Sequence, residues 1–131
     1  MLVIEVNYMI NFYYLINFLE CGHFCIKYYL KKDKRKSVVF YDKQMMSLRL
    51  VRNVFKEYYK EVIWYKNVSI DEVNFRCLSL IRVGKKYLHY IVIEKIKGDY
   101  VYYYDPLFLF LKKKRKNRFV KKWSSLVCKC S

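Results

Sequence analysis

The stretch Tyr87–Pro106, YLHYIVIEKIKGDYVYYYDP, decides how this chain folds. Two runs rich in Ile, Val and Tyr, at 87–95 and 100–104, have the composition of β-strands. The residues between them, Lys97-Gly98-Asp99, have the composition of a tight turn. The stretch therefore predicts an antiparallel β-hairpin.

A histidine and an aspartate lie on the two strands of this hairpin. His89 and Asp105 are sixteen positions apart, and the turn brings Asp105 close to the level of His89 on the neighbouring strand. Cross-strand neighbours are close enough for a carboxylate to hydrogen-bond an imidazole. A lone His in an apolar strand is more often a structural residue, and Asp105-Pro106 by itself can start a turn. The spacing of the two residues nevertheless predicts a His–Asp pair.

The thiol of Cys21 lies upstream of the hairpin, in the motif Glu20-Cys21-Gly22-His23-Phe24-Cys25. We expect a helix from Gly22 to about Leu30, with Cys21 at its start. There the unpaired N–H groups and the positive end of the helix dipole favour a thiolate, and Gly22 allows a backbone to approach closely. A lone Cys is more often a buried structural residue, and that role suits Cys25, one helical turn further on.

Together these features predict the chemistry of a cysteine peptidase. The thiolate of Cys21 attacks, the imidazole of His89 moves the proton, and the carboxylate of Asp105 holds the imidazole in the useful tautomer. This chemistry implies no cofactor.

The rest of the chain fits one α+β domain that spans residues 1–131. With 131 residues, 55% of them hydrophobic, the chain can bury one sizeable core but has no room for two domains. Helical spacing of apolar residues comes first and strand composition follows, an order typical of helices packed on an antiparallel sheet. The other expected elements are an extended segment at 1–20, helices at 43–59 and 70–75, strands at 62–65 and 77–83, and a continuation of the sheet at 107–111.

The five cysteines, at positions 21, 25, 77, 128 and 130, do not have the spacing of a secreted disulfide framework. The apolar opening 1–18 lacks the marks of a signal peptide, and its polar residues make it a poor membrane span. We therefore expect a reducing cytoplasm. A zinc site of His23 with four of the cysteines is the alternative, but the spacings do not match the usual ligand pairs and we expect the tail to be frayed. We predict no metal.

The charge is strongly positive and clustered. Lys and Arg number 27 against 11 Asp and Glu, which gives a net charge of +16. The charge is concentrated at 31–36 and 112–116, and Arg118 and Lys121-Lys122 extend the second run. Such a chain favours acidic partners, which include nucleic acid, an anionic membrane face and an acidic peptide. The alternative is that the two runs are solvated loops.

These sequence motifs resemble those of the papain-like peptidase domain at the N-terminus of bacteriocin-exporting ABC transporters. In that family a motif of an acidic residue followed by Cys-Gly-x-x-Cys lies at the start of a helix, and residues 20–25 are similar to it. A His followed by apolar residues then starts a hairpin that an Asp-Pro closes, which residues 89–106 match closely. A later Phe-x-x-x-Trp is similar to Phe119 and Trp123. The resemblance covers about 17–124, with 31–76 similar only in coarse pattern.

The resemblance implies a papain-like fold and a leader peptidase that cuts after a Gly-Gly or Gly-Ala pair. The implied partners are a bacteriocin or signalling-peptide precursor with a double-glycine leader, and the membrane and nucleotide-binding domains of an ABC transporter on the same or a separate chain. The implied location is the cytoplasmic face of the membrane. Leaders of this family form amphipathic, often acidic helices, which the positive charge of this chain suits.

One position departs from the family. The family places a Gln six residues before the nucleophile, as a side-chain donor to the oxyanion, and this chain has Leu15 there. Asn17 is the nearest amide that can substitute, and Asn11 is a poorer candidate. We expect weak but real cleavage, because Cys21, His89 and Asp105 are all retained.

Two other functions remain open from the sequence. A peptidase-like domain that binds a peptide or an exporter without cutting is supported by the missing Gln. A basic nucleic-acid-binding protein is supported by charge and aromatic content alone, with no recognised motif, so we expect no nucleic acid partner.

Overall fold

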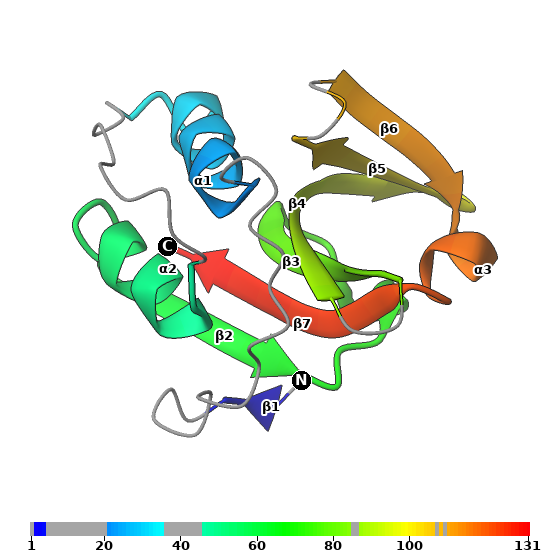
Figure 1. Ribbon diagram of the computed structural model, residues 1–131, viewed down its shortest axis with the longest axis horizontal. Coiled ribbons are helices and arrows are strands. Elements are labelled where there is room, and N and C mark those ends of the chain that lie inside the picture. Colours follow the sequence, from blue (N-terminus) through cyan, green and yellow to red (C-terminus); the bar gives the residue numbers. More distant parts are fainter. Residues whose placement is uncertain (1, 5–20, 36–45, 85–86, 107, 109) are drawn as a thin grey trace.

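The computed structural model describes residues 2–4, 21–35, 46–84, 87–106, 108 and 110–131. In these residues an antiparallel seven-stranded sheet carries helices α1 and α2 on one face (Figure 1). The elements are β1 (Leu2–Val3), α1 (Cys21–Lys32), α2 (Leu48–Phe55), β2 (Val62–Lys66), the 3-10 helix η2 (Ile70–Glu72), β3 (Cys77–Val83), β4 (Tyr87–Lys97), β5 (Tyr100–Asp105), β6 (Phe110–Arg115), α3 (Lys116–Phe119) and β7 (Trp123–Cys130).

The strands follow the order β1-β2-β7-β3-β4-β5-β6, and every neighbouring pair is antiparallel. Strands β3 to β6 run back and forth as a meander, whereas β7 returns to the middle of the sheet between β2 and β3. The order of helices before a sheet confirms the expected α+β class.

The hairpin that the sequence predicted is formed by β4 and β5. Lys97 pairs with Tyr100 across the turn, and Gly98 in that turn has φ +60°, a conformation that glycine adopts without strain. The strands expected at 62–65 and 77–83 are confirmed as β2 and β3, with β2 one residue longer.

Two expected helices are shorter than the sequence indicated. The side chain of Ser47 caps α2, which ends at Phe55 because residues 56–58 form a tight turn that leads into β2. Residues 43–45 of that expected helix lie outside the described residues, as do residues 5–20 of the expected extended segment. The helix expected at 70–75 is a single 3-10 turn with the capping box of Ser69 and Glu72, because Val73 is already extended.

The C-terminal third decides one alternative and corrects one expectation. The second basic run is not a loop, since Lys112–Arg115 belong to β6 and Lys116 begins α3. The tail is not frayed either, because β7 lies between two strands and its Val127 and Cys128 are fully buried. The continuation of the sheet expected at 107–111 begins at Phe110, and residues 107 and 109 lie outside the described part.

Alternation along the strands divides the core between the two faces of the sheet. Tyr90 and Val92 of β4 pack with the helices, whereas Ile91 and Ile93 pack on the opposite face with residues such as Trp123. Burial on both faces fixes the register of β4, because a slip of one residue would exchange the two sets. None of the helices in the described residues is long and apolar enough to cross a membrane.

Candidate active site

Cys21 is the first residue of α1, and it is 2% exposed. The helix approaches β4 closely at this end, where a Cβ on Gly22 would lie 3.0 Å from Met46 Sδ and 3.1 Å from Tyr90 Cδ2. The hydroxyl of Tyr90 donates a hydrogen bond to the Met46 carbonyl at 2.7 Å, which holds this contact together. The atoms that approach Gly22 are side-chain atoms of Met46 and Tyr90 rather than the backbone that we expected, and Tyr90 is the residue that follows His89.

His89 and Asp105 form a hydrogen-bonded pair inside the protein. His89 Nε2 lies 2.7 Å from Asp105 Oδ1, and the two residues are 0% and 3% exposed. The register of the hairpin explains the contact, because Val92 pairs with Tyr104 and Asp105 is the next residue on β5, on the side toward His89. The contact expected between these two side chains is thus formed.

The ring of His89 also interacts with Cys21. Burial lowers the pKa of His89, but the hydrogen bonds with Asp105 and with Cys21, and the charges of both groups, outweigh burial and raise the pKa to about 9. The second ring nitrogen, Nδ1, is buried and has no well-aligned hydrogen bond within the described part of the chain. The environment therefore favours an imidazolium that is shared between a carboxylate and a thiol.

Lys112 is a neighbour of this site that sequence reasoning did not identify. Its Nζ lies 3.7 Å from Asp105 Oδ2, and its side chain is 29% exposed. Lys112 reaches the carboxylate because β6 pairs with β5 and places Lys112 opposite Tyr103. The sequence signal was present but ambiguous, since Lys112 is one of five consecutive cations.

The other fully buried cysteines have the properties of structural residues. Burial, followed by the charges of Cys21 and Asp105, raises the pKa of Cys25. Burial likewise raises the pKa of Cys77 and Cys128. Cys25 is 0% exposed, as expected for the cysteine one turn further along the helix. A buried thiol with a raised pKa is inert, so Cys21 is distinguished from these three by its histidine neighbour.

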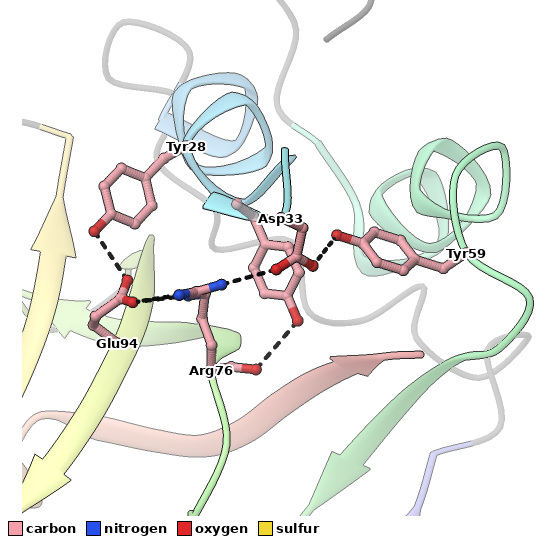
Figure 2. A network of polar contacts seen from close by, with 6 residues as sticks. Tyr28, Asp33, Tyr59, Arg76 and Glu94 are labelled. Atoms are coloured by element: carbon pink, nitrogen blue, oxygen red, sulfur yellow. Dashed lines mark hydrogen bonds and ion pairs between the residues drawn. The ribbon is translucent and has the colours of Figure 1, made fainter. Parts of the chain in front are cut away.

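A polar network fixes α1 on the sheet (Figure 2). Arg76 donates to Asp33 Oδ1 at 2.8 Å and to Glu94 Oε1 at 2.8 Å. Tyr28 donates to the other oxygen of Glu94 at 2.9 Å, and Tyr59 donates to Asp33. Because α1 also carries the thiol and β4 also carries the imidazole, this network fixes the two elements that bring them together.

The oxyanion candidate Asn17 and the divergent Leu15 lie outside the described residues. Within the described residues, no group of three or more His, Cys, Asp or Glu side chains could hold a metal ion. The arrangement that the described part contains is a thiol, an imidazole and a carboxylate, which is suited to nucleophilic attack with proton transfer.

The fold is similar to that of a solved peptidase domain. That structure is the peptidase domain of Streptococcus ComA, a bi-functional ABC transporter involved in a quorum-sensing pathway. The two structures have a TM-score of 0.72 and 17% sequence identity, over 85% of this chain and 90% of that chain. At this identity the likeness shows a shared fold. No protein-family model matches the sequence, and no curated protein matches it.

Proposed function

We propose that this chain is a cysteine peptidase that removes the double-glycine leader from a bacteriocin or signalling-peptide precursor, in association with ABC export. The observation that carries the proposal is the buried pair of His89 and Asp105, whose imidazole also interacts with the thiol at the start of α1. The similarity to a peptidase-domain fold supports the same conclusion.

In the proposed reaction Cys21 is the nucleophile. Its thiolate forms a bond to the carbonyl carbon of the scissile peptide, and the imidazolium of His89 gives its proton to the leaving amine as the C–N bond breaks. His89 then takes a proton from water, which attacks the thioester and releases the acid product and the thiolate. Asp105 keeps the imidazole in one orientation and stabilises its charged form.

The proposed partners are a precursor peptide and an ABC transporter, at the cytoplasmic face of the membrane. The transporter partner rests on the similarity in fold to the ComA peptidase domain, which is part of a bi-functional ABC transporter. The double-glycine specificity rests on the resemblance of residues 20–25 and 89–106 to the leader-peptidase family.

Cleavage of a synthetic precursor with a Gly-Gly site, followed by mass spectrometry, tests the proposal. We expect cleavage after the Gly-Gly pair, and a loss of at least about 1000-fold in rate for Cys21→Ala. Cys25→Ala is the matched control, because it removes a thiol from the same helix that we expect to be inert. Equal losses in the two variants, or cleavage that ignores the Gly-Gly pair, would contradict the proposal.

The oxyanion donor needs its own test because Leu15 replaces the Gln of the family. We propose Asn17 as the donor, so Asn17→Ala should lower kcat by about 100-fold with little change in KM, since the contact forms mainly in the transition state. If the site is only impaired by Leu15, Leu15→Gln should raise the rate and Asn17→Ala should do little.

The second candidate is a domain that binds a leader without cutting it, and Leu15 is the observation that favours it. Binding of leader peptides in a salt-sensitive way, with no cleavage by the wild type or by Leu15→Gln, would support this candidate over the peptidase.

A further inference from the structure

The outer half of the β4–β6 meander carries cations and tyrosines in two cross-strand rows. In each row a tyrosine of β5 pairs with a cation of β4 on one side and a cation of β6 on the other. These strands form the end of the sheet that lies farthest from α2 (Figure 1). The basic–aromatic face defined by the two rows consists of Lys97, Tyr100 and Arg115 in one row and Lys95, Tyr102 and Lys113 in the other.

Three of the four cations of the basic–aromatic face lie over the tyrosine rings. Lys113 Nζ lies 4.2 Å from the ring centre of Tyr100 and 5.9 Å from that of Tyr102. Lys95 Nζ lies 5.1 Å from the ring centre of Tyr102, and Arg115 Cζ lies 5.5 Å from that of Tyr100. The four cations are exposed and the two tyrosines are half-buried, so the outermost layer of this face is positive charge.

Little negative charge balances these cations. Arg115 lies 3.8 Å from Asp99, in a pair whose side chains are 59% and 63% exposed. The described residues form no other ion pair with the cations of this face. Exposed pairs of this kind are weak, so the field of the face remains positive.

An exposed apolar residue lies on the same side of the sheet as this face. Leu111 is 42% exposed and stands two residues before Lys113 on β6, so alternation places it on the same side of the strand. Cations together with an exposed apolar side chain suit a surface that rests on a membrane interface.

We propose that the basic–aromatic face binds the anionic headgroups of a lipid bilayer. Its cations are spread over two dimensions, about 10 Å across three strands and about 7 Å along them, which suits a planar array of anions. A nucleic acid strand would need free ring faces for base stacking, and here ammonium groups lie over the rings. An acidic peptide in an extended conformation would contact at most one row of these cations. The face contains none of Cys21, His89 and Asp105, so the proposal is independent of the peptidase activity.

Co-sedimentation of the 131-residue chain with lipid vesicles tests the proposal. We expect binding to vesicles of phosphatidylcholine with phosphatidylglycerol and none to phosphatidylcholine alone, with a steep loss as salt is raised. The double variant Lys95→Gln and Lys113→Gln should weaken this binding about tenfold, because each cation near an anionic surface contributes separately.

The matched control is Lys60→Gln with Lys66→Gln, which removes the same charge from exposed positions beside and at the end of β2. This control should change vesicle binding less than about threefold, because its cations lie outside the proposed contact. Thermal unfolding followed by circular dichroism establishes that each variant is folded. The proposal would be overturned if the chain did not bind anionic vesicles, or if the two double variants lost binding equally. It would also be overturned if the chain bound a single-stranded oligonucleotide more tightly than vesicles and the variant Lys95→Gln with Lys113→Gln lost that binding.

Discussion

The two ends of the β4–β5 hairpin use similar residues for different purposes. At the end that faces α1, His89 and Asp105 are buried and paired at 2.7 Å. At the turn end, Asp99 and Arg115 lie 3.8 Å apart and are each more than half exposed. Water screens the exposed pair, whereas Asp105 and Cys21 together raise the pKa of the buried imidazole to about 9.

The difference shows that burial, rather than residue type, decides what a charged side chain does in this hairpin. Desolvation disfavours an isolated charge, so the buried end holds charge only where a partner stabilises it. The turn end can carry unbalanced cations at little cost because solvent surrounds them. One hairpin can therefore hold the proposed reactive pair at one end and the proposed lipid-binding surface at the other.

The largest expected difference between the two ends of the hairpin is in the cleavage rate, when Asp105 or Asp99 is replaced. Asp105→Ala should lower the rate of precursor cleavage by at least about 100-fold, because the imidazole loses both its orientation and the charge that stabilises its protonated form. Asp99→Ala is the matched control, and its rate should stay within about threefold of the wild type because its carboxylate is exposed and screened. The comparison fails if the two variants lose activity equally.

The pH dependence of stability should also come from the buried end. The pKa of His89 is raised from 6.5 to about 9 in the folded protein, so the proton stabilises the fold fully below about pH 6.5, and this stabilisation is lost as the pH rises through 9. In a Cys21→Ser background, which removes the contribution of Cys21 to the raised pKa, we expect a smaller loss of roughly 1–2 kcal/mol in the free energy of unfolding as the pH rises above 6.5.

Urea denaturation at several pH values measures this loss. Adding Asp105→Ala to the same background should remove most of the pH dependence, because the carboxylate that raises the pKa is gone. If the free energy of unfolding still depended on pH in the double variant, the pH dependence would come from groups elsewhere in the chain.

An effect of similar size is expected from the network in Figure 2. Arg76→Met should lower the free energy of unfolding by about 1–2 kcal/mol, because Glu94 is then left half-buried without its main partner. Arg82→Met is the matched control on β3, since Arg82 is exposed and should change stability by less than about 0.5 kcal/mol. Chemical denaturation of both variants decides whether the network stabilises the contact of α1 with the sheet.

The smallest effect is expected at the turn end. The variant Lys95→Gln with Lys113→Gln should change the free energy of unfolding by less than about 1 kcal/mol, because exposed cation–π contacts are weak and the variant relieves repulsion between cations. The same variant should retain the cleavage rate of the wild type. A large loss of stability would mean that these lysines serve the fold rather than a surface.

Local sequence was sufficient for the hairpin and for the helix that begins at Cys21. Strands β3, β4 and β5 combine strand-forming composition with turn residues between them, so neighbouring residues alone specify them. The turn set the register only as far as Lys95, because a bulge between Ile93 and Lys95 shifts the pairing by one residue. That shift, which the local pattern did not predict, places Asp105 on the same face of the hairpin as His89.

Long-range packing decided what the sequence did not reveal. β7 interrupts its apolar residues with two serines and a lysine, and it is a strand because β2 and β3 offer it hydrogen bonds on both sides. The lysines of β6 form a strand for a related reason, since β5 provides the pairing and the side chains reach solvent. The approach of Lys112 to Asp105 depends on that pairing, so no local pattern could have predicted it.

The sequence by itself determined the residue types of the candidate site, the α+β order of elements and the hairpin that joins His89 to Asp105. Only the tertiary structure decided that the thiol of Cys21 meets the imidazole of His89. The reason is that this contact joins residues 68 positions apart, and it forms through the packing of α1 on β4 at Gly22 and through the Arg76 network. Secondary structure follows from neighbours in the chain, whereas a reactive pair across two elements depends on how the core buries them both.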